Sequence, residues 1–456
     1  MRIFQYKSLY AAGLAAASIL ASILGSMLAT SLTAAAQAIP NDRLLNTDVA
    51  VYRRSPKELW VYDTRPEVGV GAHGLDTKIV KLIRTLDIRL VRHTMYWNQI
   101  ENTETPGKYD PKTLAYWDEL VPRCKAAGIE LEVVVHGNPP GVDFTHRQEG
   151  YRRFASFMAD MSARYPSIRF WELWNEMDQA FTDLFGNGNA DISLRERGKM
   201  YAEMLKLTYP AIKSANPKAW VLTGGMTDWN DFPRGIYEGG GGPYFDFMNI
   251  HTYGVPVLYG WVSRGLSLYS VMREFHDDGR PIWNTEFGID AGNVVNAWGF
   301  PHSGNPPKED GAGFDEIHLQ TWKECLEDNV RRRLYVKTLG YQFTAGNETS
   351  RERLQKEGHL PAGRSQDDYG YGLLRADGHT PRPTYDWLKK QDLNHRIIGP
   401  SGTRTVDIEL YVPDGAVPVG YKFDYEWRKP WMIIKGVVVR SLEPTVIKLD
   451  AAPIKH

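Results

Sequence analysis

A repeated strand and helix pattern constrains the fold more than any other feature of this sequence. Between residues 68 and 390, eight short apolar runs alternate with amphipathic segments; in the first unit, a helix with one apolar face follows Asp76. Such alternation is typical of β-α units around a parallel sheet. Eight units without a glycine-rich phosphate fingerprint favour an α/β fold of the closed (β/α)8 type, a TIM barrel, over an open doubly wound sheet. The predicted strands cover residues 68–72, 88–93, 129–135, 168–174, 220–224, 245–252, 281–285 and 340–344.

A β-rich region follows the barrel pattern. After about residue 394 the helical periodicity stops, and four short strands are predicted between Gly and Pro turns, at 405–411, 420–427, 431–439 and 445–449. We therefore divide the chain into a signal peptide at 1–38, an N-terminal extension at 39–67, a barrel at 68–393 and a small C-terminal all-β domain at 394–456. The extension contains the run LWVY (59–62) and can add a strand to the β domain. Two long loops, 287–313 and 345–380, are predicted lids or binding walls.

The first 38 residues have the pattern of a secretory signal peptide. Arg2 and Lys7 precede a long uncharged stretch, which ends in the small-x-small sequence Ala36-Gln37-Ala38 of a signal-peptidase site. Cleavage after Ala38 would place the mature chain outside the cell or in the periplasm. The alternative is an uncleaved membrane anchor, because the stretch is long enough to span a bilayer, although its Ala and Ser content makes it weakly apolar.

Charge and cysteine content exclude several classes of partner and scaffold. The chain has 54 Lys and Arg residues against 55 Asp and Glu residues, a formal net charge of -1. This balance gives no electrostatic reason to expect nucleic acid or an anionic membrane as the partner. The two cysteines, Cys124 and Cys325, are too few for a disulfide scaffold or a cysteine-based metal site. They either pair with each other or are buried separately.

Two glutamates stand where predicted strands end, which is where the catalytic groups of a TIM barrel lie. Glu176 follows strand four in the segment FWELWNE (170–176), and Glu286 ends strand seven in IWNTE (282–286). These strands lie on opposite sides of an eight-strand ring, so the two carboxylates can face each other. Such a pair hydrolyses glycosides, and a separation of about 5–5.5 Å implies a retaining reaction. Glu172 shares the strand parity of Glu176 and is predicted to point into the barrel as the charge partner of an arginine.

The segments WELWNE and WNTEFG resemble the strand-four and strand-seven motifs of the clan A glycoside hydrolases. The resemblance implies that Glu176 is the acid/base and Glu286 the nucleophile. It also implies that Asn175 binds the sugar 2-hydroxyl, and that Arg92, late in strand two, keeps the nucleophile ionised. A neighbouring positive charge lowers the pKa of a carboxylate, which agrees with these roles.

Further site residues are predicted on strands two, three and six. His251 and Tyr253 match the His-x-Tyr of the clan on strand six, which implies that Tyr253 hydrogen-bonds the nucleophile and that His251 lies near the acid/base. Trp97 after strand two, and His136 and Asn138 after strand three, are candidate sugar contacts from their loop positions alone.

Within the clan, the resemblance is closest to glycoside hydrolase family 39, over roughly residues 68–390. A β-rich region after the barrel and the phrase YGLLRADG (371–378) carry this likeness. It implies a β-xylosidase, an α-iduronidase or an endo-acting enzyme that cuts secreted bacterial polysaccharides. One departure is the lack of a Trp at the end of strand eight, where Tyr341 or Phe343 can take its place.

Together, these features predict a secreted retaining glycoside hydrolase that acts on a polysaccharide or oligosaccharide, with endo-cleavage of an exopolysaccharide as the first expectation. The alternatives are an exo-acting glycosidase such as a β-xylosidase, a transglycosylase and, in a different class, an inactive carbohydrate-binding protein. No His and Glu cluster has metal-ligand spacing in the sequence, so we expect neither a metal nor another cofactor. The expected partner is a carbohydrate, with no nucleic acid and no stable membrane anchor after signal cleavage.

Overall fold

The computed structural model describes residues 48–179, 183–185, 191–253, 257–289, 312–344, 371–375, 378–391, 403–412, 414–425 and 431–451. The predicted signal segment, most of the two long predicted loops and part of the phrase at 371–378 lie outside these ranges. Within them, no helix combines the length and the apolar character that a membrane crossing needs.

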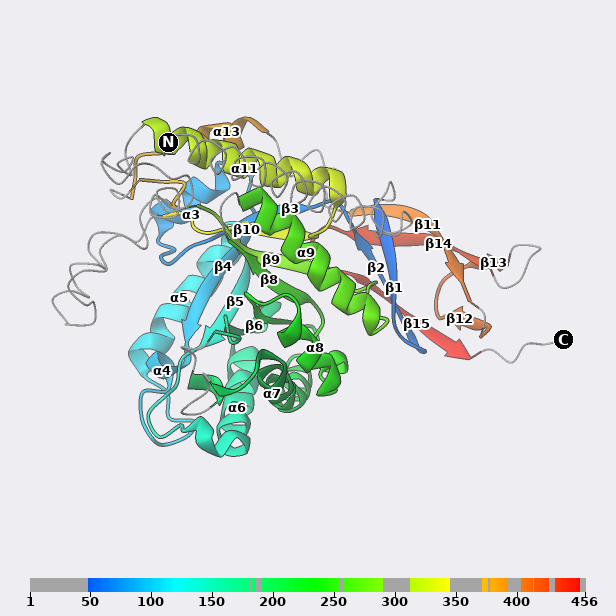
Figure 1. Cartoon of the computed structure of the whole chain (residues 1–456), viewed down its shortest axis with the longest axis horizontal. Coiled ribbons are helices and arrows are strands. Elements are labelled where there is room, and N and C mark those ends of the chain that lie inside the picture. Colours follow the sequence, from blue (N-terminus) through cyan, green and yellow to red (C-terminus); the bar gives the residue numbers. More distant parts are fainter. Residues whose placement is uncertain are drawn as a thin grey trace, which may run out of the picture. The chain divides into compact units, whose positions relative to one another are not determined.

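Eight parallel strands form the centre of the fold (Figure 1). Their order in the sheet is β7-β6-β5-β4-β3-β10-β9-β8, and isolated parallel bridges from Leu222 to Phe247 and from Met226 to Ile250 join its two outer strands. The sheet is thus a closed barrel, and the predicted (β/α)8 fold is confirmed. The barrel strands are β3 (Glu67–Gly71), β4 (Leu90–Tyr96), β5 (Glu130–His136), β6 (Phe170–Asn175), β7 (Trp220–Gly225), β8 (Met248–Thr252), β9 (Ile282–Phe287) and β10 (Lys337–Gly340).

Strand β10 differs from its predicted position. It begins at Lys337, whereas the sequence pattern placed the eighth strand at 340–344. Lys337 is buried, and its ammonium group lies 3.6 Å from a carboxylate oxygen of the buried Glu67 at the start of β3. Because the strand begins with a charged residue that is buried through its ion pair, a search for apolar residues does not find where the strand starts. The strand ends at Gly340, so Tyr341 is the first residue after it.

Helices follow the strands and lie on the outside of the barrel (Figure 1). Side chains of the preceding residues fix several helix starts: Asp76 accepts a hydrogen bond from the Ile79 N–H, and Asp110 accepts one from the Thr113 N–H. The α-helices are α3 (Thr77–Arg84), α4 (Trp97–Ile100), α5 (Pro111–Ala126), α6 (Arg147–Arg164), α7 (Leu194–Ala215), α8 (Asp231–Glu238), α9 (Val257–Glu274), α11 (Ala312–Arg332) and α13 (Pro383–Gln391), with short 3-10 turns η1 (Phe144–His146), η2 (Asp183–Phe185) and η4 (Gly242–Tyr244).

The remaining strands form two small antiparallel sheets, in the orders β1-β2-β15-β12 and β11-β14-β13. The predicted strand in the N-terminal extension is present as β2, which pairs with β15 from the far end of the chain. The bounds are β1 (Val49–Ser55), β2 (Glu58–Asp63), β11 (Thr403–Tyr411), β12 (Ala416–Pro418), β13 (Phe423–Tyr425), β14 (Trp431–Arg440) and β15 (Thr445–Ala451).

Strand β2 serves two hydrophobic clusters because its side chains alternate between two faces. Leu59 and Val61 pack with the apolar residues of the small sheets. Trp60 and Tyr62 pack instead with residues at the starts of barrel strands. The ring centroids of Trp60 and Trp220 are 5.1 Å apart. This contact closes the N-terminal end of the barrel and leaves the C-terminal ends of the strands for the site.

Both cysteines are buried as free thiols, which decides between the two alternatives that the sequence left open. Burial raises the pKa of the Cys124 thiol to about 11. Each cysteine therefore acts as a small apolar core residue.

Candidate active site

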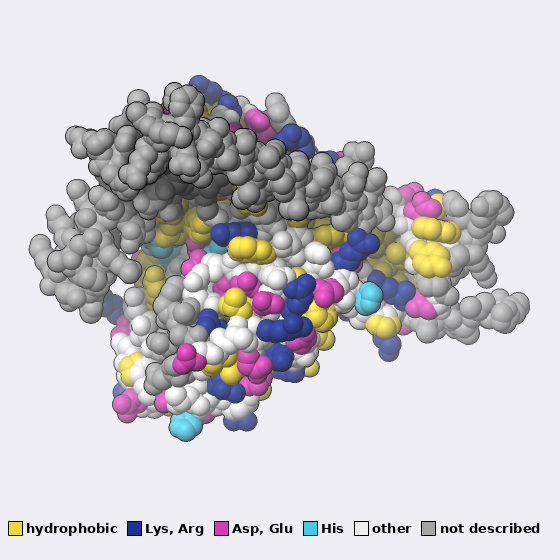
Figure 2. All heavy atoms as spheres, in the orientation of Figure 1, with side chains coloured by type: hydrophobic (Ala, Val, Ile, Leu, Met, Phe, Trp, Pro, Cys, Tyr) yellow, Lys and Arg dark blue, Asp and Glu magenta, His cyan; other side chains and the backbone are white. Residues whose placement is uncertain are grey.

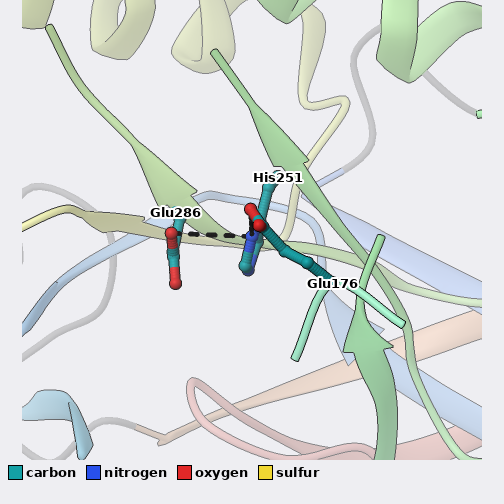
Figure 3. A group of neighbouring side chains, drawn as sticks. All are labelled: Glu176, His251 and Glu286. Atoms are coloured by element: carbon teal, nitrogen blue, oxygen red, sulfur yellow. Dashed lines mark hydrogen bonds and ion pairs between the residues drawn. The ribbon is translucent and has the colours of Figure 1, made fainter. Parts of the chain in front are cut away.

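Three side chains meet at the C-terminal ends of the strands (Figure 3). Glu286 belongs to β9, His251 to β8, and Glu176 directly follows β6. One carboxylate oxygen of each glutamate and one imidazole nitrogen all lie within 4.8 Å of one another. The two predicted carboxylates therefore face each other at a separation of the short, retaining kind rather than the roughly 6.5–9.5 Å of inverting enzymes.

Glu286 is held by two strong donors. Arg92 Nη1 donates to Oε1 at 2.5 Å, and the Tyr253 hydroxyl donates to Oε2 at 2.7 Å. Burial raises the pKa of Glu286, but the positive charges of His251 and Arg92 and the Tyr253 hydrogen bond outweigh it, so the pKa is lowered. Glu286 is therefore held as a carboxylate, the form that a nucleophile needs.

Glu176 has a different environment. Its side chain is 20 % exposed, against 10 % for that of Glu286, and its carboxylate lies within hydrogen-bond distance of His251 Nδ1, at 3.0 Å. The backbone of Glu176 lies in the left-handed region, with φ of 44°, and its N–H donates to Gly225 O at 3.0 Å. Strained backbone of this kind clusters at functional sites. Here it turns the carboxyl group out of the strand and towards the barrel mouth.

His251 connects the two glutamates. Its Nδ1 lies 3.0 Å from Glu176 and 3.5 Å from Glu286, while Nε2 lies 3.1 Å from Thr285 Oγ1, which in turn hydrogen-bonds Asn249. Burial lowers the pKa of His251, but the two carboxylates outweigh it, and the net direction is upward. With both nitrogens facing acceptors, the imidazole can donate from each side.

Gly225, at the end of β7, makes room for this histidine. A Cβ at residue 225 would lie 1.9 Å from His251 Nε2, a distance that no side chain can occupy. The absence of a side chain at one strand end thus sets the position of the imidazole on the next strand.

The Arg92 guanidinium binds several groups at once. Its Nε and Nη2 donate to the two carboxylate oxygens of Glu172 at 2.8 and 3.0 Å, and Nη2 also donates to Asn175 Oδ1 at 2.8 Å. The Glu172 carboxylate also accepts the Gly225 N–H at 2.8 Å. The predicted pairing of Glu172 with an arginine is therefore present. Since Arg92 occupies the amide oxygen of Asn175, its NH2 group is the part that can donate to a sugar.

The three candidate sugar contacts differ in burial and in hydrogen bonding. His136 is part-buried beside Tyr96, with ring centroids 5.1 Å apart, and burial together with the Arg92 charge lowers its pKa to about 4, so the ring is neutral. Asn138 has a buried amide oxygen without a hydrogen-bond partner in the described part of the chain. For Trp97 the prediction is wrong: the side chain is 0 % exposed, its indole N–H donates to Glu101 at 2.6 Å, and it packs on α6. Its loop position gave no sign of this burial.

The residues after β10 add an aromatic side chain next to Tyr253, which holds Glu286. Tyr341 is part-buried, its hydroxyl lies 3.1 Å from His73 Nε2, and its ring makes edge contacts with Tyr253 and Tyr371. Phe343 is fully buried. Of the two residues predicted to replace the missing tryptophan, Tyr341 is therefore the one placed to contact a sugar.

Glu132 and the pair formed by Thr285 and Asn249 were not predicted from the sequence. Glu132 is fully buried in β5, and its carboxylate lies 3.5 Å from Arg92 Nε. One signal could have revealed it: Glu132 is an acidic residue inside the otherwise apolar run LEVVV (131–135). Thr285 and Asn249 gave no comparable signal, because polar residues at these positions are common in buried strands.

The clustered Glu176, His251 and Glu286 also have the spacing of a possible cation site. However, Arg92 and Tyr253 already donate to the two oxygens of Glu286, and His251 Nε2 faces Thr285. These contacts supply positive charge and proton donors without an ion. The donor set therefore suits acid-base and nucleophilic chemistry.

The barrel and the paired carboxylates define a glycoside hydrolase of clan A, a class whose members retain the anomeric configuration. The model for cellulase (glycosyl hydrolase family 5) matches residues 64–301, more than half of the chain and a segment that includes both glutamates. The chain therefore belongs to glycosyl hydrolase family 5, and its substrate is a carbohydrate. The clan A assignment from the sequence is confirmed.

Two solved structures of glycoside hydrolases share the fold, and a third is also similar to the chain. A glucosidase from Croceicoccus marinus has 12% identity and a TM-score of 0.52, with 83% of this chain and 82% of that one covered. An exo-beta-1,4-mannosidase from Opitutaceae bacterium strain TAV5 has 15% identity and a TM-score of 0.50, with 74% of this chain and 60% of that one covered. A family 39 glycoside hydrolase from Bacteroides cellulosilyticus WH2 has 15% identity and a TM-score of 0.48, with 89% of each chain covered. No curated protein matches the chain.

We expect Tyr253→Phe to move the acid limb of the kcat/KM pH profile to higher pH. The Tyr253 hydroxyl stabilises the ionised form of Glu286, so its removal raises the pKa of that carboxyl group. Because the predicted nucleophile works only when ionised, activity is lost as the pH falls through this pKa. The shift should be on the order of one pH unit.

The matched control for this variant is Tyr259→Phe, since Tyr259 is 54% exposed on α9. An acid limb that stays in place in Tyr253→Phe would contradict the ionised state that we assign to Glu286.

Proposed function

We propose that this chain is a secreted, endo-acting glycoside hydrolase that cuts an exopolysaccharide by a double displacement, with Glu286 as the nucleophile and Glu176 as the acid/base. One observation carries the assignment of roles. The two carboxylates lie close together, yet Glu286 is bound by Arg92 and Tyr253, whereas Glu176 faces His251 and is the more exposed of the two. One is kept charged, and the other is free to exchange a proton.

The geometry supports the following sequence of steps. Glu286 attacks the anomeric carbon while Glu176 gives its proton to the leaving oxygen, which forms a glycosyl-enzyme ester and releases the leaving group. Glu176 then takes a proton from water, and the water oxygen displaces Glu286, so the configuration is retained. His251 donates to one oxygen of Glu176, which leaves the other oxygen for the substrate. The Asn175 NH2 group is placed to bind the sugar 2-hydroxyl.

The balance of charge in the chain fits a carbohydrate partner. On the face seen in Figure 2, acidic and basic side chains intermingle, in keeping with the formal net charge of -1. Electrostatic attraction of nucleic acid or an anionic membrane is therefore not part of the proposal. The polysaccharide substrate and the endo mode of cleavage rest on the family 39 likeness of the sequence. This finer likeness, in the β-rich region and the phrase at 371–378, stays a prediction beside the family 5 match.

Product analysis tests the proposed activity. We expect the mature protein to release a ladder of oligosaccharides with retained anomers from at least one of a panel of bacterial exopolysaccharides and plant polysaccharides, as read by mass spectrometry and NMR. In Glu286→Gln the products should fall by roughly 10³-fold or more, while the exposed Glu119→Gln on α5 should leave them unchanged.

Other outcomes distinguish the alternatives. Release of monosaccharides would mean an exo-acting enzyme, and longer products formed from short donors would mean a transglycosylase. Binding without any product would support the carbohydrate-binding protein. Turnover that survives in Glu286→Gln would overturn the nucleophile.

The acid/base role of Glu176 predicts a loss that depends on the leaving group. With Glu176→Ala, kcat/KM on the oligosaccharide should fall by about 10²–10⁴-fold, which is the usual contribution of general acid catalysis. A dinitrophenyl glycoside of the same sugar should lose far less, because its leaving group needs no proton. Glu119→Ala is the control. Equal losses on both substrates would count against the role.

Secretion is the remaining part of the proposal, and residues 1–38 support it through Arg2, Lys7 and the cleavage sequence at 36–38. We expect protein exported by a bacterial host to begin at Ile39 when its N-terminal sequence is read. A full-length chain that stays with the membrane fraction would show that the segment is an anchor instead.

A further inference from the structure

A third carboxyl group shares the guanidinium that holds Glu286. Glu132 on β5 and Glu172 on β6 are both 0 % exposed, and both lie beside Arg92 on β4. Both carboxyl groups approach the same nitrogen: Arg92 Nε lies 2.8 Å from Glu172 Oε2 and 3.5 Å from Glu132 Oε2. Two ionised carboxylates held around one nitrogen repel each other, whereas a proton on one of them allows it to donate a hydrogen bond to the other.

The surrounding donors decide which of the two carries the proton. Glu172 accepts hydrogen bonds from Arg92 Nε and Nη2 and from the Gly225 N–H. Neither oxygen of Glu132 accepts a hydrogen bond from any donor among the described residues. The distance from its carboxylate to Arg92 Nε is 3.5 Å, which is longer than the two distances from Arg92 to the Glu172 oxygens. A buried carboxylate without donors is costly, so the proton belongs on Glu132.

We propose that Glu132 is a permanently protonated carboxylic acid that donates a hydrogen bond to Glu172 and thereby acts as a positioning residue for Arg92 and the nucleophile. The order of contacts gives the reason. The Glu132 proton orients the Glu172 carboxylate, Glu172 takes the Nε and Nη2 edge of Arg92, and the remaining Nη1 is left for Glu286.

Electrostatics agree with this placement. The charged groups that act on Glu132 are Glu172, Arg92 and, on the far side of Arg92, Glu286. Burial and the charge of Glu172 raise the pKa of Glu132 well above its usual range, although Arg92 opposes them. If Glu132 were ionised, Arg92 would face three carboxylates, and the added negative charge would make ionisation of Glu286 harder. A neutral Glu132 therefore keeps the field of Arg92 available to Glu286.

Infrared spectroscopy tests the protonation state without a substrate. Because the proposed acid Glu176 also carries a proton, the comparison is made in a Glu176→Gln background. In such protein labelled with 13C-glutamate at neutral pH, we expect the carbonyl stretch of a protonated carboxyl group and its loss when Glu132→Gln is added. A spectrum in which this band is absent from Glu176→Gln, or persists unchanged after Glu132→Gln is added, would overturn the proposal.

Kinetics test the positioning role, and this arm rests on the proposed function of Glu286. Glu132→Gln replaces a neutral donor by a neutral donor, so kcat/KM and the acid limb of its pH profile should stay close to wild type. Glu132→Leu removes the donor, so kcat/KM should fall roughly tenfold and the acid limb should move to higher pH, because Arg92 is held less well against Glu286.

Two kinetic results would contradict the proposal. An acid limb that moves to lower pH in Glu132→Gln would mean that the substitution removed a negative charge, and hence that Glu132 was ionised. A Glu132→Leu variant that behaves like Glu132→Gln would mean that the hydrogen bond positions nothing. If Glu132→Leu does not fold, the infrared band and the acid limb of Glu132→Gln still decide the protonation state.

Discussion

Burial of the Arg92 guanidinium inside the barrel is the constraint on which the rest of the site depends. A buried charge has to be paired, and loss of a partner in such a pair costs about 3–5 kcal/mol. Arg92 satisfies this requirement with groups from two other strands, Glu172 and Asn175 on β6 and Glu286 on β9. The same contacts that neutralise the guanidinium therefore tie β4, β6 and β9 into one geometry. In this barrel, the stability of the interior and the ionisation of Glu286, the proposed nucleophile, have a common origin.

The two ends of the barrel have different tasks. At the N-terminal end, Trp60 and Tyr62 of β2 cover the strand starts with aromatic surface, and the ion pair of Glu67 with Lys337 lies nearby at the strand starts. At the other end, polar and charged side chains face the mouth. This division is usual for TIM barrels, where the lower face gives stability and the upper face chemistry. It allows the upper face to hold a strained and highly charged site.

Much of the fold could be predicted from the sequence because β-α alternation is a local signal repeated eight times. The positions of Glu176, Glu286, Arg92, His251 and Tyr253 followed from strand ends and from motif resemblance, and these side chains do come together. Three features were not predicted. The start of β10 depends on an ion pair across strands, the burial of Trp97 depends on packing against α6, and Glu132 depends on which side chains of three strands meet in the interior. All three are contacts between segments far apart in the chain, which periodicity along one segment does not encode.

Backbone conformation explains why Glu172 in β6 and Glu176 directly after it point in different directions. Glu172 and Glu176 share the same parity, and an unbroken β6 would point both into the barrel. Instead, Trp174 and Glu176 have φ values of 73° and 44°, a conformation that costs roughly 1–3 kcal/mol per residue. Burial of the Trp174 ring against Phe144 and Phe154, and the hydrogen bond from the Glu176 N–H to Gly225, oppose this strain. The strand therefore stops before Glu176: Glu172 stays inside and anchors Arg92, and Glu176 turns outward to His251, the position that its proposed acid/base role requires.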